Sequence, residues 1–402
     1  MTLIAALSLL LIFAHLFGRI AERFGQPALA GQMLAGIVLG PSMLQWVQSS
    51  AALQAIADIS VLFVVITAGL EMRFTHVLDA FRGWGSLALM LGFVVPAAAT
   101  AAFTFALDMN FIPALVATLC VSVTALPVAL RILSEFGLMQ TRVARVAISS
   151  ALMTDILIFL VLGIAIAVAQ PRVDNSLFIT ASVAVAKLGA LLVVVGICHF
   201  VCQRLASRES SKESPAPRKF ADNVLVLTLI FMIALGAAAE LLGFHFVIGV
   251  FLAALMVTRD LISDTRFEKL EQTCELMTVS VFGPLFLAFQ GIQFQLGALH
   301  NWTLLGGLIA IAVASKLVGG YATGRLLKLS SHESKGVGII MNARGVMEMV
   351  VASVAYRAGI VDQELFSALL VLGIVTTILT PILLKPWMKS PDLPATMRAG
   401  GA

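Results

Sequence analysis

One acidic residue, Asp155, lies within the otherwise apolar run from Val146 to Val168, and Thr154 comes directly before it. The run is long enough to cross a lipid bilayer, because about 20 apolar residues suffice for a helix. A carboxylate near the centre of such a span costs at least ~2.5–3.5 kcal/mol on insertion scales. It therefore needs a charged partner, a proton or a cation, and all three indicate ion transport.

A second polar group lies in the apolar segment 112–133, where Ser122 and Thr124 precede Pro127. A proline lacks the N–H donor and clashes with the carbonyl four residues earlier, so it frees backbone carbonyl oxygens within the span. The residue types predict an interrupted helix whose hydroxyl and carbonyl oxygens can bind a cation.

The segment 335–356 contains a comparable interruption, with Asn342, Arg344 and Glu348 around a glycine. Arg344 and Glu348 are four residues apart and would share a helix face, which predicts an ion pair inside the membrane; a purely structural role is the alternative. Two interrupted spans indicate an ion site near the membrane midplane. A proline kink and an unrelated polar turn remain the alternative interpretation.

Lys316 is the only charged residue between Leu304 and Tyr321. Arg325 and Lys328 mark the nearer end of that span, and Lys316 lies about two and a half turns deeper. We expect a buried partner for it, either Asp155 or a backbone carbonyl. The alternative is a lysine that snorkels to the membrane surface.

The composition predicts an all-α polytopic membrane protein with about 13 transmembrane helices. The 402 residues are 60% hydrophobic and 12% charged, whereas soluble domains carry about 25% charged residues. The predicted spans are 2–18, 27–44, 52–70, 84–106, 112–133, 143–168, 177–203, 220–242, 244–258, 274–291, 302–325, 335–356 and 364–386.

Alternating connections between these spans place nearly all basic residues on one side and leave only Arg172 and Arg357 on the other. The positive-inside rule then puts the N-terminus outside and the C-terminus in the cytoplasm. The net charge of +4 is explained by this topology, so we expect no nucleic-acid partner.

The polar stretch 204–219 is rich in Ser, Pro and charged residues, and it predicts a cytoplasmic linker. It separates a first membrane half (1–203), which ends in a connecting helix, from a second half (220–388), followed by a short cytoplasmic tail (389–402). Six spans on each side of the connecting helix would form inverted repeats, a common transporter plan. We expect no fused regulatory domain after the tail.

Five motifs resemble those of the monovalent cation:proton antiporters, the sodium/hydrogen exchanger superfamily, and are most similar to the branch with NapA, the Kef systems and plant cation/proton exchangers. The motifs are GQPALAGQMLAGIVLGP (25–41), AGLE (68–71), SVTALPVALRILSEFGL (122–138), GVFLAAL (249–255) and MNARGVMEMV (341–350). They follow the family order over nearly the whole chain.

The resemblance implies a NapA/NhaA-like fold of 13 spans in which two broken helices cross, and a homodimer embedded in membrane lipids. It implies that Asp155 binds the proton or the transported Na⁺ or K⁺, that Ser122 and Thr124 lend oxygens, and that Lys316 is the basic residue of the eleventh span. No resident cofactor is implied. We expect location in the cytoplasmic membrane of a bacterium.

One position departs from the family pattern. Electrogenic members carry two adjacent acidic residues in the sixth span, and this chain has Thr154 before Asp155. Thr154 cannot ionise, which favours electroneutral exchange, although Lys316 leaves the proton number open. The alternatives are a channel-like potassium efflux pathway, opened by a separate cytoplasmic regulatory subunit, and a sodium-coupled symporter for an organic anion.

Overall fold

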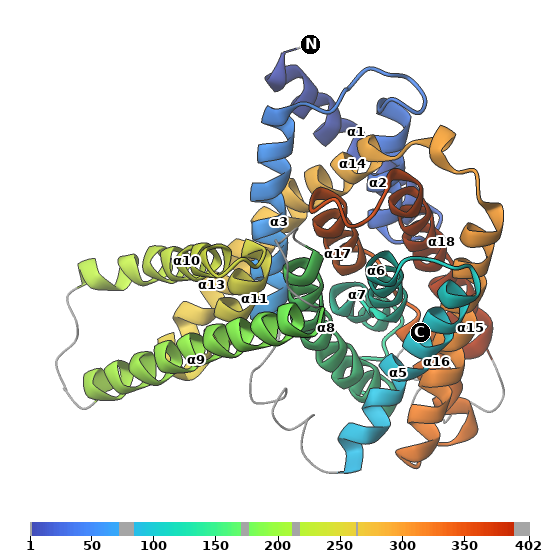
Figure 1. Cartoon of the computed structure of the whole chain (residues 1–402). Coiled ribbons are helices and arrows are strands. Elements are labelled where there is room, and N and C mark those ends of the chain that lie inside the picture. The colour runs from blue at the N-terminus through green and yellow to red at the C-terminus, as the bar shows by residue number, and fades with distance from the viewer. Residues whose placement is uncertain (1, 72–83, 170–176, 211–217, 263, 390–402) are drawn as a thin grey trace. The chain divides into compact units, whose positions relative to one another are not determined.

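A computed structural model describes residues 2–71, 84–169, 177–210, 218–262 and 264–389 (Figure 1). Within these ranges every regular element is a helix and no strand occurs, which confirms the predicted all-α class. The helices form two compact units, each built from separate stretches of chain. Unit 1 comprises Met1–Ala57, Val77–Ile158 and Pro284–Ala402, and unit 2 comprises Asp58–His76 and Phe159–Gly283.

Unit 1 holds most of the helices that concern the candidate site. They are α1 (Leu3–Arg23), α2 (Ala28–Leu39), α5 (Trp84–Ala106), α6 (Phe111–Ser122), α7 (Leu126–Glu135), α14 (Gly283–Gln293, from its second residue), the short η2 (Leu296–Ala298), α15 (Trp302–Leu326), α16 (Ser331–Met341), α17 (Val346–Arg357) and α18 (Gln363–Met388). Two helices, α3 (Ala51–Glu71) and α8 (Arg142–Ala169), begin in unit 1 and continue into unit 2.

Unit 2 contains the remaining helices of the described chain. They are α9 (Leu177–Ser210), α10 (Arg218–Leu241), α11 (Phe246–Met256), α12 (Arg259–Ile262), α13 (Asp264–Met277) and the π-helix η1 (Thr278–Phe282). In this unit the hydroxyls of Thr67 and Thr278 lie 2.8 Å apart, so α3 is joined to η1 by a hydrogen bond.

Seven helices of the described chain are long and apolar enough to cross a membrane, and a bent pair, α16 with α17, adds an eighth span if it is counted as one. Five shorter apolar helices lie at other predicted spans: Ala28–Leu39, Phe111–Ser122, Val185–Cys198, Val226–Leu241 and Phe246–Met256. The helices fall on the predicted segments, and the total of thirteen spans stays a prediction.

Both predicted interruptions are present. The helix that begins at Phe111 ends at Ser122, and α7 starts at Leu126 with Pro127 in its first turn. A proline is tolerated there because the first N–H groups of a helix have no intrahelical acceptor. Helix α16 ends at Met341 and α17 starts at Val346, with a bend of 41° between them.

Two boundaries differ from the sequence-based expectation. Helices extend into the predicted linker 204–219, because α9 continues to Ser210 and α10 begins at Arg218; 211–217 and the tail beyond residue 389 lie outside the described residues. The span predicted at 274–291 is preceded by α13, which begins at Asp264. The prediction ended these elements where the sequence becomes polar. Lys, Arg and Glu are good helix formers, so the helices continue beyond those points.

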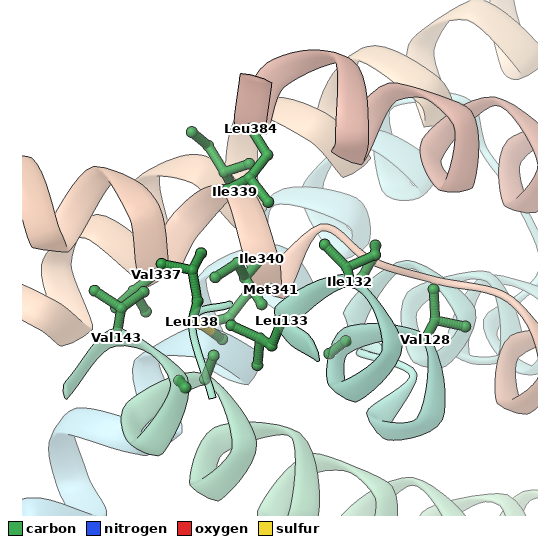
Figure 2. Packing of buried hydrophobic residues seen from close by; sticks show 14 of the residues in the cluster. Val128, Ile132, Leu133, Leu138, Val143, Val337, Ile339, Ile340, Met341 and Leu384 are labelled. Atoms are coloured by element: carbon green, nitrogen blue, oxygen red, sulfur yellow. The ribbon is translucent and has the colours of Figure 1, made fainter. Parts of the chain in front are cut away.

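An apolar cluster in unit 1 packs α7 and α16, one helix from each interrupted span, together (Figure 2). Val128, Ile132 and Leu133 of α7 lie in one cluster with Val337 and Ile340 of α16, and all five are buried. Helices α8 and α18 contribute further residues, Val143 and Leu384 among those labelled. Because lipid tails are as apolar as these side chains, the cluster stabilises the fold through close packing.

Small residues bring α15 directly against α16. A Cβ atom added to Gly320 would lie 2.5 Å from the Cα of Gly338, and one added to Gly324 would lie 2.8 Å from the Cα of Ser334. Small residues spaced four apart allow such an approach between membrane helices. The contact fixes the position of Lys316, which lies one turn before Gly320 on α15.

Candidate ion-binding site

The carboxyl end of α6 receives two positively charged side chains. The last four carbonyls of a helix have no partner inside it, and α6 ends at Ser122. The Arg344 guanidinium donates to the carbonyl oxygens of Cys120, at 3.0 Å, and Val121. The Lys316 ammonium donates to the carbonyl oxygen of Ser122. Two buried cations therefore balance the partial negative charge at this helix end.

Lys316 is fully buried and has three oxygen partners, one for each ammonium hydrogen. Besides Ser122, its Nζ donates to Thr124 Oγ1 at 2.7 Å and to the carbonyl oxygen of Gly92 on α5 at 3.2 Å. Gly92 has a free carbonyl because Pro96, four residues later in α5, has no N–H to donate. The lysine thus does not snorkel, and backbone carbonyls are among its partners.

A glycine forms the second interruption. Gly345 has a φ of +153°, in the region that favours glycine, and a Cβ there would lie 3.1 Å from Val128 Cγ2. The backbone must therefore turn at this position without a side chain.

Neutral donors satisfy the carbonyl groups around this turn. Thr124 Oγ1 donates to the carbonyl oxygen of Met341 at 3.0 Å, and the backbone N–H of Ala125 donates to that of Ala343 at 3.0 Å. The hydroxyl of Thr377 on α18 donates to the carbonyl oxygen of Arg344 at 2.8 Å. The two interruptions are thus joined by hydrogen bonds in both directions.

Arg344 and Glu348 form the predicted ion pair, with 3.8 Å between Arg344 Nη1 and Glu348 Oε1. Both side chains are fully buried. Glu348 lies in the first turn of α17, where a carboxylate is favoured by the helix dipole. The pair joins the amino end of α17 to the carboxyl end of α6 through a single guanidinium.

Asp155 and Thr154 are buried on α8, each with 1% of its surface exposed. The Thr154 hydroxyl donates to the carbonyl oxygen of Ser150, one turn earlier. Ser150 in turn donates to the carbonyl oxygen of Leu89 on α5, at 3.2 Å. Lys316 interacts electrostatically with Asp155. The Asp155 carboxylate therefore belongs to the same buried charge cluster as the two interruptions.

Two other residues that the sequence singled out, Ser122 and Asn342, have distinct environments. Ser122 Oγ donates its hydrogen to the carbonyl oxygen of Thr118 at 2.7 Å, within its own helix. The lone pairs of the Ser122 hydroxyl oxygen therefore remain as acceptors. Asn342 is fully buried at the end of α16, and within the described chain its side-chain O and N atoms have no hydrogen-bond partner. The buried amide is free to bind an ion or water.

The transmembrane sodium/hydrogen exchanger family model matches residues 8–390. This chain belongs to that family. The match covers every element of unit 1 that forms the cluster described above.

Several curated relatives of this family member are antiporters by name. Cation/H(+) antiporter 15 of Arabidopsis thaliana is 29% identical, and the alignment covers 96% of this chain and 48% of that protein. The Na(+)/H(+)-K(+) antiporter GerN of Bacillus cereus is 26% identical and covers 94% of both chains. The chain thus spans about half the length of the plant relative and nearly all of the bacterial one.

A solved structure supports the fold. The sodium proton antiporter MjNhaP1 from Methanocaldococcus jannaschii superposes with a TM-score of 0.70 over 96% of both chains, at 17% identity. At that identity the likeness concerns the fold alone.

Sequence reasoning missed three contributors to the site of this exchanger-family chain. Gly92 supplies a carbonyl to Lys316, and Pro96 is the signal that could have indicated it, because a proline inside a span frees the carbonyl four residues earlier. Thr377 gave no signal, since a threonine in an apolar span most often bonds to its own helix. Cys120 contributes only its carbonyl oxygen, which any residue would supply.

Proposed function

We propose that the chain exchanges a monovalent cation, Na⁺ or K⁺, for protons across the membrane by alternating access at Asp155. The observation that carries the proposal is the burial of this carboxylate on α8 and its electrostatic interaction with Lys316, whose ammonium binds the end of α6. The family membership and the names of the relatives support it.

The chemistry is competition for one negative charge. Deprotonated Asp155 binds a dehydrated cation together with oxygens of Thr154 and Ser122, because hard cations prefer oxygen ligands. Both hydroxyls give their hydrogen to their own helix and so present lone pairs to a cation. The Thr124 hydroxyl is bound to Lys316 in this conformation, so its use as a ligand requires Lys316 to move.

The segment that carries Asp155 can change its position in the membrane more easily when the Asp155 charge is neutralised than when the carboxylate is ionised. A proton or a cation on Asp155 each removes the negative charge of its buried carboxylate, which is costly inside a membrane. The empty, ionised site resists movement, which couples the two fluxes. The interrupted helices supply the bistable element that alternating access needs.

A single exchanging carboxylate favours an electroneutral cycle. Glu348 is paired with Arg344, and Thr154 before Asp155 cannot ionise, so Asp155 is the one acid of the cluster that exchanges its proton for a cation. A proton or a monovalent cation therefore adds the same single charge, as long as Lys316 keeps its proton. Loss of that proton on cation binding would move two protons per cation and make the cycle electrogenic.

Orientation and assembly form part of the proposal. The N-terminus lies outside and the C-terminus in the cytoplasm of a bacterium, and the distribution of basic residues supports this orientation. The halves 1–203 and 220–388 form inverted repeats, with an interruption in the fifth span of each, and two copies associate as a homodimer. No resident cofactor takes part.

Proteoliposomes loaded with a pH-sensitive dye test the proposal. Addition of Na⁺ or K⁺ should dissipate a pH gradient with wild-type protein, and Asp155→Asn should reduce the rate to that of empty liposomes. Asp264→Asn makes the same chemical change on a carboxylate that is 77% exposed, and it should retain wild-type exchange. Wild-type rates in Asp155→Asn would refute the mechanism.

The same vesicles identify the transported ion and the number of protons exchanged per cation. Sodium, potassium, lithium and rubidium are compared with and without a clamped membrane potential, and an electroneutral cycle gives equal rates in both conditions. A channel-like pathway would instead give potassium flux that does not carry protons. A symporter would require an organic anion for any sodium-dependent signal.

A further inference from the structure

A pocket of about 520 Å³ lies among α15, α16 and α18 in unit 1. This volume is in the range of small-molecule sites in proteins. Its lining residues are Leu317, Val318, Tyr321, Lys335, Ile339, Leu383 and Trp387. It is separate from the charge cluster, because none of the residues that bind Lys316 or Arg344 lines it.

The walls of this pocket are apolar. Leu317, Val318, Ile339 and Leu383 present hydrocarbon surface, and 59% of Val318 is exposed. The indole of Trp387 is held in place, since its Nε1 donates to the carbonyl oxygen of His332 at 2.9 Å. On a membrane helix, such an exposed apolar surface is suited to contact lipid hydrocarbon.

One edge of the pocket is formed by two residues with polar tips, Lys335 and Tyr321, whose hydrocarbon parts line it. Lys335 is the only charged residue among the lining residues, and it is exposed. Tyr321 lies one turn before Arg325, and its hydroxyl is 3.3 Å from Ser331 Oγ. Tyr and Trp are the residues that gather at membrane–water interfaces. The pocket therefore runs from the hydrocarbon region to the interface.

We propose that this pocket binds an anionic phospholipid, with an acyl chain along the apolar wall and the phosphate at Lys335 and Tyr321. Basic pockets between membrane helices are suited to such headgroups, and a lysine near the surface favours an anionic over a zwitterionic lipid. The apolar wall excludes a free phosphate as the occupant, since most of the pocket would gain nothing from it. The proposal does not depend on cation exchange.

The bound lipid would stabilise the packing of the helices that form the ion site. Leu317 follows Lys316 directly on α15, and Ile339 is two residues before Met341, whose carbonyl binds Thr124. An acyl chain between α15, α16 and α18 fills space that would otherwise allow α16 to shift. Occupancy should therefore change the exchange rate without a direct contact to the ion.

Fluorescence of Trp387 tests the binding. Trp46, Trp84 and Trp302 are replaced by Phe in the full chain, which leaves Trp387 as the only indole. Bromine atoms on lipid acyl chains quench a tryptophan at short range. Brominated phosphatidylglycerol should bind at Trp387 about five-fold more strongly than brominated phosphatidylcholine, the ratio expected for one lysine near the surface.

Two substitutions test whether the preference for phosphatidylglycerol over phosphatidylcholine arises at this pocket. Lys335→Gln should reduce the ratio to about one, and Lys335→Arg should keep it. Lys389→Gln is the matched control, because it removes an exposed lysine at the same end of unit 1 that does not line the pocket. Equal quenching by both lipids in the parent protein, or an equal loss in the Lys389→Gln variant, would overturn the proposal.

Discussion

The two interrupted helices are similar in outline and opposite in chemistry. At the end of α6 the carbonyls of Cys120, Val121 and Ser122 are bound by charged side chains. At the end of α16 the corresponding carbonyls are bound by hydroxyls and a backbone N–H. The first interruption therefore concentrates charge, and the second holds the backbone in a turn.

Each interruption is completed by the other. Arg344, from the second, caps α6, while Thr124 and Ala125, from the first, bind carbonyls next to α16. Neither helix end has its polar groups satisfied alone, and unsatisfied backbone groups are costly in the membrane. The two segments should consequently form together, and damage to one should be detectable at the other.

The largest effect is expected from Arg344→Gln, which removes the charge that links both interruptions. Removal of one partner from a buried ion pair typically costs about 3–5 kcal/mol, because the other charge stays buried. Glu348→Gln should cost less, since Arg344 keeps its two carbonyl partners. Thermal unfolding in detergent measures both.

The double variant Arg344→Gln, Glu348→Gln provides the control for this prediction. If Arg344→Gln destabilises the protein because the buried Glu348 carboxylate loses its ion-pair partner, Glu348→Gln should recover part of the lost stability. If the double variant is the sum of the two single ones, the ion pair does not link the two interruptions.

A smaller effect is expected at the turns themselves, and it should be unequal. Gly345→Ala places a Cβ in a region of positive φ and 3.1 Å from Val128 Cγ2, a strain of about 1–3 kcal/mol. Pro127→Ala should cost less than 1 kcal/mol, because Pro127 lies in the first turn of α7 and no helix bond is lost or gained. Equal losses of thermal stability would show that the two turns are equally constrained.

The charged residues of the candidate site could be singled out in the sequence, because the free-energy cost of burying a charge in a bilayer depends on residue type. Asp155, Lys316, Arg344 and Glu348 are conspicuous in apolar runs, and all four are buried in the structure. The helix boundaries were predicted less well at polar segments such as 264–273, where helix propensity and polarity give opposite indications.

The partners of these residues could not be predicted from the sequence. Lys316 binds Gly92 O, Ser122 O and Thr124 Oγ1, and two of these three are backbone atoms that every residue has. Thr377 reaches Arg344 from a helix 33 positions later, a pairing that only tertiary packing determines. Residue type reveals which groups need a partner, and the fold decides which atom supplies it.

Small effects on stability, with unequal effects on exchange, should come from the two threonines that serve the second turn. Thr124→Val and Thr377→Val each remove a hydroxyl that donates to one carbonyl, and each should cost about 1 kcal/mol of stability. Only Thr124 also binds the Lys316 ammonium, at 2.7 Å. Exchange rates in proteoliposomes should therefore fall in Thr124→Val, recover in Thr124→Ser, and stay near the wild-type value in Thr377→Val. Similar exchange rates in the two valine variants would mean that the hydroxyl supports the turn alone, and that the charged interruption does not depend on Thr124 to hold its lysine.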